Sequence, residues 1–243
     1  MTLQNKTALI TGGGTGIGEG CALALAREGC QVAIAGRRAD KLAEVAKRFE
    51  GTPAIKTHAV DVTDRGSVAE LFRWADKELG RVDILVNCAG VNTVKRSIHD
   101  LVPEEWDRIM AINATGAYNC IREVLPQMKA RKDGLIVNIN STSGIRAGVL
   151  GGVAYSASKF AMAALGITVA QEVREMDIRI TNIYPGEVET PILDLRPVPV
   201  SAEHRVKILQ PEDVGAVLAT IAALPPRANV SEIVIKPTIQ AFS

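Results

Sequence analysis

The sequence predicts an α/β fold in which a single doubly wound, parallel sheet of about seven strands carries helices on both faces. Short runs rich in Val and Ile recur along the chain, and helix-length amphipathic segments separate them. Most of these runs are apolar almost throughout, as strands covered on both faces are. Parallel strands need right-handed crossovers, so we expect a ligand cleft at their carboxyl ends, where the strand order reverses.

The expected strands are Thr7–Thr11, Gln31–Ala35, Ala54–Val60, Ile84–Cys88, Leu135–Ile139, Arg179–Ile183 and Ile233–Ile235. The expected helices are Ile17–Glu28, Ala39–Phe49, Ser67–Leu79, Glu104–Ala130, Val153–Met176 and Glu212–Leu224. Pro126 stands late in the fourth helix, where a proline removes a hydrogen bond, so we expect a bend or an end there. The segment 185–210 contains four prolines and no clear periodicity. A loop of this length is typically a lid or a binding loop, with a poorly ordered connection as the alternative.

Length and composition favour one globular domain over residues 1–243. A net charge of +1 gives no global field that would recruit nucleic acid or an anionic membrane surface. No targeting segment precedes the first strand, and no apolar run approaches the ~18–20 residues of a membrane span, so we expect a cytoplasmic protein. The cysteines and histidines lack metal-ligand spacing, which predicts no metal site. These residues are Cys21, Cys30, Cys88, Cys120, His58, His99 and His204.

A glycine-rich turn joins the first strand to the first helix. Glycines at this place let the backbone approach a pyrophosphate closely, and the helix N-terminus offers unpaired N–H donors. A plain flexible turn is the alternative, but the position between strand and helix favours a dinucleotide site of the Rossmann type. The expected cofactor-binding residues of the turn are Gly12, Gly14, Thr15, Gly16, Ile17 and Gly18.

The end of the second strand predicts which nicotinamide cofactor binds. An acidic residue there would hold the ribose hydroxyls of NAD, and this chain has none. Gly36 leaves room, and the guanidinium of Arg37, followed by Arg38, is suited to a 2′-phosphate. NADP(H) is therefore favoured over NAD(H), while a solvated charge pair is the alternative for the two arginines.

Two further strand ends carry candidate cofactor residues. Asp61 and Val62 follow the third strand at an adenine-facing position, although Asp61 alone is equally typical of a helix N-cap or a turn. Asn87, Ala89 and Gly90 end the fourth strand and bring small residues close to the cofactor, with an ordinary turn as the alternative.

Four polar residues form the candidate chemical site. Tyr155 and Lys159 are four residues apart on a predicted helix, so both side chains face one cavity. A neighbouring cation favours the phenolate, which would make the phenol a usable acid or base. Ser141 stands at a strand end where its hydroxyl can polarise a substrate oxygen. Asn113 lies inside a helix, where Asn is mildly unfavourable; a solvent-facing or locally bonded Asn is the plain explanation.

Together these motifs resemble the short-chain dehydrogenase/reductase family over essentially the whole chain. The likeness rests on the glycine turn, Asp61-Val62, Asn87-Cys88-Ala89-Gly90, the Asn113, Ser141, Tyr155 and Lys159 tetrad, and the run Pro185-Gly186-Glu187-Val188-Glu189-Thr190. Cys88 stands where a second Asn is frequent. Ser141 precedes Tyr155 by one residue more than is common, which leaves Thr142 and Ser143 as substitutes.

The resemblance implies a role for each tetrad member. Tyr155 exchanges a proton with the substrate oxygen, which Ser141 orients, and the nicotinamide carries the hydride. Lys159 binds the nicotinamide ribose and lowers the pKa of Tyr155, while Asn113 holds a water of a proton relay.

The same likeness places the segment after the sixth strand at the nicotinamide. Pro185, Gly186 and Val188 would flank the ring, Thr190 would bond its carboxamide, and residues 185–210 would form the substrate-loop region. Asn87 and Gly90 would line the ribose side.

The activity that follows is transfer of a hydride between NADP(H) and a carbonyl or secondary alcohol of a small polar substrate. A catalytically silent NADP(H)-binding sensor or scaffold is the alternative, and an epimerase or dehydratase ranks below it. Lys95, Arg96 and Arg146 fall in loops near the site mouth, where a cation could receive a carboxylate; solvated surface charges are the default reading. By likeness, the helices around 104–130 and 153–176 would form a homotetramer or homodimer.

Overall fold

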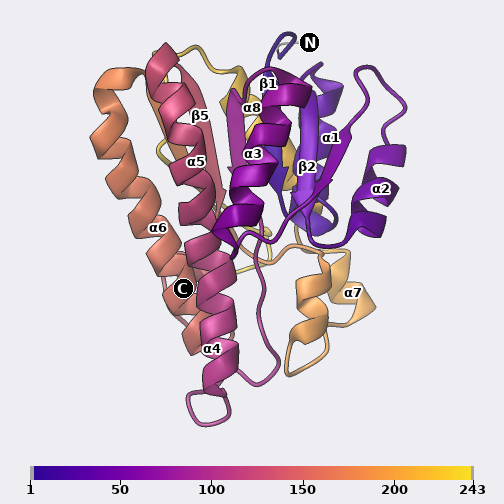
Figure 1. The fold of residues 1–243 in the computed structure, drawn as a ribbon. Helices are drawn as coiled ribbons and strands as arrows, with labels where there is room; N and C mark the ends of the chain where they lie inside the picture. The colour runs from indigo at the N-terminus through magenta and orange to yellow at the C-terminus, as the bar shows by residue number, and fades with distance from the viewer. Residues whose placement is uncertain (1–2, 242–243) are drawn as a thin grey trace.

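A single parallel sheet of seven strands organises the chain, in a computed structural model that describes residues 3–241 (Figure 1). The strands stand in the order β3-β2-β1-β4-β5-β6-β7, which confirms the predicted doubly wound sheet. Their bounds are β1 Thr7–Thr11, β2 Gln31–Gly36, β3 Lys56–Ala59, β4 Ile84–Asn87, β5 Gly134–Ile139, β6 Ile178–Pro185 and β7 Glu232–Ile235.

The strand order reverses at β1, which pairs with β2 on one side and β4 on the other. In this register Thr11 lies opposite Ala35 of β2 and Asn87 of β4, so the three strands end at the same level. The chain leaves these ends in opposite directions, to helices on opposite faces. A crevice therefore opens between them, as it does at the switch point of doubly wound sheets.

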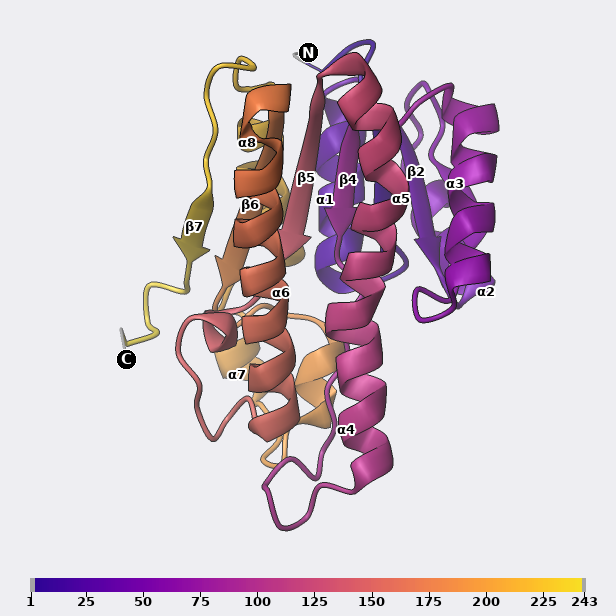
Figure 2. The same ribbon diagram turned by 60° about the vertical axis from the view of Figure 1, so that its left-hand side comes forward.

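Helices cover both faces of the sheet (Figure 2). One layer consists of α1 Gly16–Arg27, α2 Ala39–Lys47 and α8 Pro211–Ala223; the other consists of α3 Arg65–Leu79, α5 Gly116–Arg131 and α6 Val153–Val173. Adjacent residues of β1 serve the two cores: Ile10 packs with the first layer and Leu9 with the second. Burial on both faces explains why the strands between the edge strands β3 and β7 are apolar without alternation.

The helix expected at Glu104–Ala130 is divided. α4 spans Pro103–Met110, a π-helical turn covers Ala111–Thr115, and α5 then runs to Arg131. Of the bend or end expected at Pro126, the end is wrong, because the helix continues through this residue to Arg131. Pro126 lies on an exposed face of the helix, where water can bond the carbonyl that loses its partner.

The segment 185–210 forms an excursion at the carboxyl ends of the strands, and α7 lies in it (Figure 1). It contains a 3₁₀ turn, Pro191–Leu195, and the short helix α7, Ala202–Arg205. A bridge between Val188 and Leu209 closes its base. The segment therefore ends beside its own start and lies over the carboxyl ends of the strands before α8 begins.

One helical segment meets the length and composition of a membrane span, contrary to the expectation that no run does. It covers Val153–Met176, with a mean hydropathy of 1.4 over its most apolar window. Its N-terminal half lies against the sheet, where Met162 and Ala163 are buried. Buried core helices of this length pass the same test, so the feature is weak evidence for a membrane.

Candidate active site

A cavity of about 590 Å³ opens at the carboxyl ends of the strands, on both sides of the switch point. It extends from the glycine turn and the end of β2 to the start of α6. The residues that line it are Gly12, Gly14, Thr15, Gly16, Ile17, Gly36, Arg37, Arg38, Lys41, Leu42, Val60, Asp61, Val62, Cys88, Ala89, Gly90, Val91, Ile112, Ile139, Asn140, Tyr155, Lys159, Thr190, Pro191, Ile192 and Leu195.

The glycine turn fits a pyrophosphate. Gly12 has a positive φ of +68°, and a Cβ on Gly18 would lie 2.3 Å from the carbonyl oxygen of Gly12. Only glycine at both positions allows the turn to fold back on the first turn of α1. Thr15, the N-cap of α1, makes no side-chain capping bond, so the first amides of the helix remain available to an anion.

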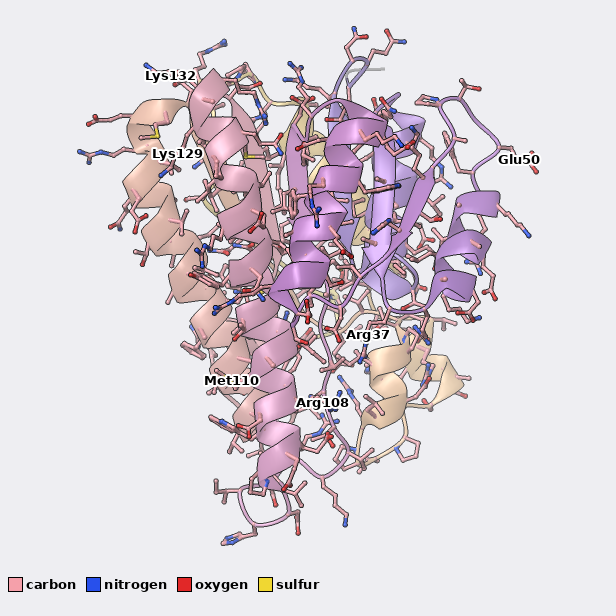
Figure 3. The ribbon with its side chains drawn as sticks, viewed as in Figure 1. Arg37, Glu50, Arg108, Met110, Lys129 and Lys132 are labelled. Atoms are coloured by element: carbon pink, nitrogen blue, oxygen red, sulfur yellow. The ribbon has the colours of Figure 1, made fainter. Side chains whose placement is uncertain are left out.

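The other end of the cavity is basic. Arg37 and Arg38 are exposed, and Arg38 Nη2 lies 3.5 Å from Thr15 Oγ1. Arg37 is near the carboxyl ends of the strands, on the side of α7 (Figure 3). Lys41, the next cation along α2, lines the same pocket. A Cβ on Gly36 would meet only Leu42 Cδ2, at 3.8 Å, so this corner is open as well as positive.

Asp61 is both a turn residue and a wall of the cavity. Its Oδ1 accepts hydrogen bonds from Thr63 N at 2.9 Å and Thr63 Oγ1 at 2.8 Å. These bonds, with a smaller contribution from the charge of Arg37, lower the pKa of Asp61. The carboxylate is therefore ionised at the edge of the pocket, and Val62 lies beside it.

Asn87, expected on the ribose side, does not line the cavity. Its amide nitrogen donates to Asn138 Oδ1 at 3.0 Å, and Asn138 donates in turn to Asn182 at 3.1 Å. The three amides form a buried ladder across β4, β5 and β6, since they occupy paired positions of the sheet. Ala89 and Gly90, by contrast, line the cavity as expected.

The residues expected around the nicotinamide lie partly behind the cavity wall. Pro185 is the last residue of β6, and Gly186 N donates to Ile235 O at 2.8 Å. Val188 is held in the bridge to Leu209. None of these three lines the cavity, whereas Thr190 does, and a Cβ on Gly16 would lie 2.9 Å from Thr190 Cγ2. Thr190 therefore closes over the glycine turn.

Lys159 and Tyr155 share one face at the start of α6. Lys159 Nζ donates to Ile139 O at 2.9 Å and lies 5.7 Å from the centre of the Tyr155 ring. Burial lowers the pKa of Lys159 to about 8, and burial raises the pKa of Tyr155. A net lowering of the tyrosine pKa, expected from its neighbour, is thus not found: desolvation outweighs the charges, and the ammonium is engaged by a carbonyl.

Burial raises the pKa of Tyr155, whereas Ser141 and Arg96 lower it. A hydrogen bond with the Ser141 side chain is the larger influence that lowers the pKa of Tyr155, and the charge of Arg96 adds to it. Ser141 is the N-cap of the 3₁₀ turn Thr142–Gly144, and its hydroxyl accepts from Ser143 N at 3.1 Å. The structure therefore brings Ser141, of the three hydroxyl candidates, to the phenol.

Asn113 lies in the π-helical turn and is fully buried. Its Oδ1 accepts from Val91 N at 2.8 Å, and its Nδ2 donates to Val91 O and Ser158 Oγ, both at 3.0 Å. A Cβ on Gly90 would lie 3.6 Å from Asn113 Oδ1 and 3.7 Å from Lys159 Nζ. Asn113 and Lys159 thus converge on one point, and the π turn explains an asparagine inside a helix.

Several residues of the site escaped the sequence analysis. Among them are Lys41, Asn140 and the turn Pro191–Leu195, of which Pro191, Ile192 and Leu195 line the cavity. Asn140 directly follows β5, so its place at the strand end could be predicted from the sequence. The 3₁₀ turn carries no periodicity, and its approach to the glycine turn depends on tertiary packing alone.

The three cations expected at the site mouth differ in exposure and in location. Arg146 is exposed and does not line the main cavity. Lys95 is exposed at a second cavity. Arg96 is buried, contrary to the default reading of a surface charge.

The cysteine thiols and metal ligands add no second chemistry to the described part of the chain. The four cysteines are free thiols, and burial raises the pKa of Cys88, which lines the cavity, to about 12. Within residues 3–241 no group of three or more His, Cys, Asp and Glu side chains could hold a metal ion.

Comparisons with known proteins agree with this geometry. An uncharacterised oxidoreductase of Staphylococcus saprophyticus is 34% identical over 239 residues, which cover 98% of this chain and 99% of the relative. A closed serine dehydrogenase complexed with NADP+ superposes with a TM-score of 0.89 at 28% identity, covering 98% of this chain and 97% of its own. A 3-ketoacyl-(acyl-carrier-protein) reductase of Brucella melitensis complexed with NADH gives 0.87 at 28% identity, covering 97% and 98%. The family model described as short chain dehydrogenase matches residues 6–197, and the chain belongs to this family of oxidoreductases.

Proposed function

We propose that this oxidoreductase transfers a hydride between NADP(H) and a carbonyl or secondary alcohol of a small polar substrate. The observation that carries the proposal is the placement of Tyr155: it lines the same cavity as Lys159 and the glycine turn, and the Ser141 side chain is placed to lower the pKa of its phenol. An acid of this kind beside a dinucleotide site is suited to reduce a carbonyl.

In the proposed reduction, Tyr155 donates its proton to the substrate oxygen, and Ser141 bonds and orients that oxygen. Bound NADPH supplies the hydride that reaches the carbonyl carbon. Burial keeps the phenol protonated, which suits the donor role. Lys159 and Asn113 converge at Gly90 beside the cavity, where they would hold the ribose and a water that returns a proton to the phenol.

The chain offers groups along the length of the cavity to hold the cofactor. The amides at the start of α1 suit the pyrophosphate, and Asp61 suits the exocyclic amine of adenine. Ala89, Gly90 and Thr190 line the nicotinamide half. Five further residues do not line the cavity and would support the residues that do: Gly18, Asn87, Pro185, Gly186 and Val188. The whole proposed cofactor-binding set comprises Gly12, Gly14, Thr15, Gly16, Ile17, Gly18, Arg37, Arg38, Asp61, Val62, Asn87, Ala89, Gly90, Tyr155, Lys159, Pro185, Gly186, Val188 and Thr190.

The positive charge at the end of the cavity that would hold the adenosine favours NADP(H) over NAD(H). Arg37, Arg38 and Lys41 line the cavity together with Gly36, and no carboxylate comes directly after β2. Three cations suit a 2′-phosphate, and none of them would be drawn to the ribose hydroxyls of NAD with the same strength. Structural neighbours of the chain bind either cofactor, so the cations carry this choice.

We also propose that residues 1–243 act as one catalytic domain, with 185–210 as its substrate loop, in a homotetramer or homodimer. Aromatic and aliphatic side chains lie exposed on α4, α5 and α6, and a second copy would cover them. These side chains are Trp106, Tyr118, Phe160 and Ile167. A cytoplasmic address is proposed on the four free thiols.

A substrate screen tests the proposal. Purified protein is incubated with NADPH and a panel of aldehydes, ketones, keto acids and keto alcohols, and the loss of NADPH absorbance is followed. We expect consumption with at least one small polar carbonyl, and faster turnover with NADPH than with NADH. Tight NADPH binding with no consumption across the panel would instead indicate a sensor or scaffold.

A further inference from the structure

Arg96 is the only buried arginine among residues 3–241, with 8% of its surface exposed. Its guanidinium makes no ion pair in that part of the chain and instead donates to three main-chain carbonyls. Nε bonds Thr93 O at 2.9 Å, Nη1 bonds Leu150 O at 2.7 Å, and Nη2 bonds Leu195 O. Burying a cation without a counter-ion is costly, so its retention invites a reason in the site.

The three carbonyls come from segments that lie far apart in the sequence. Thr93 is in the loop after β4, Leu150 is in the loop before α6, and Leu195 ends the 3₁₀ turn of the 185–210 segment. Leu150 and Leu195 are 54 and 99 residues from Arg96 in the sequence. One planar guanidinium therefore joins three loops that share no sheet or helix.

The backbone of Arg96 braces the start of the catalytic helix. Its carbonyl accepts a bond from Val153 N, the first residue of α6, at 3.3 Å. Gly152 has a φ of +80°, and a Cβ there would lie 2.5 Å from Arg96 Cβ. Arg96 is thus packed against the residues that lead directly into Tyr155.

Leu195 connects this cluster to the chemistry. It lines the main cavity together with Tyr155 and Lys159, and Pro191 and Ile192 of the same turn line it as well. The bond from Arg96 Nη2 to Leu195 O is the contact that ties the turn to the loops beside Tyr155. Opening of the turn would move one wall of the cavity away from the phenol.

We propose that Arg96 is a positioning residue that holds the Pro191–Leu195 turn against the start of α6, so that the substrate end of the cavity keeps its shape. This inference rests on the proposed function for its kinetic consequence. The structural consequence, a closed turn, is independent of any activity. A purely stabilising role would act on the whole fold and would leave this turn no more mobile than its surroundings.

A lysine at position 96 cannot replace the forked guanidinium of Arg96. An ammonium carries three donors on one atom, whereas the guanidinium presents five N–H groups in a plane and reaches separated carbonyls. Arg96→Lys keeps the positive charge near Tyr155 and removes the bridge. Arg179→Lys is the matched control, because Arg179 Nη1 also reaches three carbonyls, those of Ile221, Leu224 and Ala228, far from the cavity.

Hydrogen exchange measured by mass spectrometry on the full-length protein tests the structural half. In Arg96→Lys, we expect the amides of Leu193 and Arg196, which close the turn through Thr190 O and Leu193 O, to exchange at least about tenfold faster. In Arg179→Lys they should exchange at the wild-type rate. Unchanged exchange at these amides in a folded Arg96→Lys protein overturns the proposal; Arg96→Gln serves if the lysine variant is not recovered folded.

Kinetics and cofactor binding test the other part of the proposal, that Arg96 keeps the shape of the substrate end of the cavity. For a carbonyl from the screen, we expect kcat/KM to fall about 10- to 100-fold in Arg96→Lys, mainly through KM. Binding of 2′,5′-ADP, which needs only the adenosine end, should stay at the wild-type affinity. Wild-type KM with fast exchange would overturn the link to the substrate end. An inactive wild type with fast exchange in Arg96→Lys would reject the proposed function and leave the positioning role supported.

Discussion

Lys159 Nζ donates to the main-chain carbonyl of Ile139 at 2.9 Å. Ile139 is the last residue of β5, two residues before Ser141, and Lys159 lies one helical turn after Tyr155. The bond therefore fastens α6 to the end of β5, the strand that precedes Ser141. The relative placement of the phenol and the hydroxyl depends on this contact between helix and sheet.

Ser141→Ala should raise the pKa of Tyr155, because the serine hydrogen bond is the largest influence that lowers it. The rate of alcohol oxidation should then rise at a higher pH than in the wild type, and kcat should fall about 10²- to 10³-fold. Ser141→Thr keeps the hydroxyl and should restore most of the rate. The test is a pH–rate profile of the wild type, Ser141→Ala and Ser141→Thr. A wild-type profile in Ser141→Ala would show that Ser141 does not act on Tyr155.

Lys159 should make the stability of the protein depend on pH. Its pKa is about 8 in the folded state and 10.5 as the reference value, so unfolding takes up a proton between these values. The free energy of unfolding should therefore rise from about pH 8 to about pH 10.5, and the cost of the buried charge is fully present below pH 8. By 1.36 kcal/mol per pKa unit, the gain is on the order of 3 kcal/mol at most.

Lys159→Met should lose this rise. Urea unfolding at pH 7 and pH 10 measures the difference between the variant and the wild type, which cancels the titration of other groups. Parallel pH dependence of the two proteins would mean that the Lys159 ammonium is not destabilised by burial.

Gly36→Asp combined with Arg37→Ile should shift preference toward NAD(H). The corner at Gly36 has room for the new side chain, since only Leu42 Cδ2 comes within 4 Å of a Cβ there. The carboxylate would bond ribose hydroxyls and repel a 2′-phosphate. We expect the ratio of kcat/KM for NADPH over NADH to fall at least about 100-fold, with Arg65→Ile, an exposed arginine outside the cavity, as the control. A retained NADPH preference would place the phosphate elsewhere.

Asn138→Ala should destabilise the fold by roughly 2 to 4 kcal/mol, because it removes the partner of both Asn87 and Asn182 in a buried ladder. Thr220→Ala, which removes an exposed hydroxyl bonded within α8, should change the free energy of unfolding by less than about 0.5 kcal/mol. Equal effects of the two changes in denaturant unfolding would argue against a ladder that supports the strand ends.

The order of elements was predictable from sequence, since most strands are short apolar runs and helix-length segments separate them. β1 is predicted residue for residue at Thr7–Thr11, and no end of the other six strands shifts by more than two residues. The division of the helix at Ala111–Thr115 was not predictable, because a π turn leaves no periodic signature. Its only trace in the sequence was Asn113, an unfavourable residue for a helix interior.

The site was predictable where a motif carries the backbone geometry, as in the glycine turn and the Tyr155–Lys159 spacing. It was not predictable where tertiary packing decides. Asn87 has the motif of a cofactor residue, yet its amide joins the neighbouring strands. Arg96 looked like a surface charge, because nothing local shows that loops 54 and 99 residues away supply its carbonyl partners.

The central claim is that the chain moves a hydride to a carbonyl carbon while Tyr155 supplies the proton. It is tested most directly by incubating the protein with NADPH deuterated at nicotinamide C4 and a carbonyl from the screen, then analysing the alcohol by mass spectrometry. We predict one deuterium on the carbinol carbon with wild type, and none with Tyr155→Phe, which should still bind NADPH. Labelled alcohol formed by Tyr155→Phe at a rate close to wild type would contradict the account.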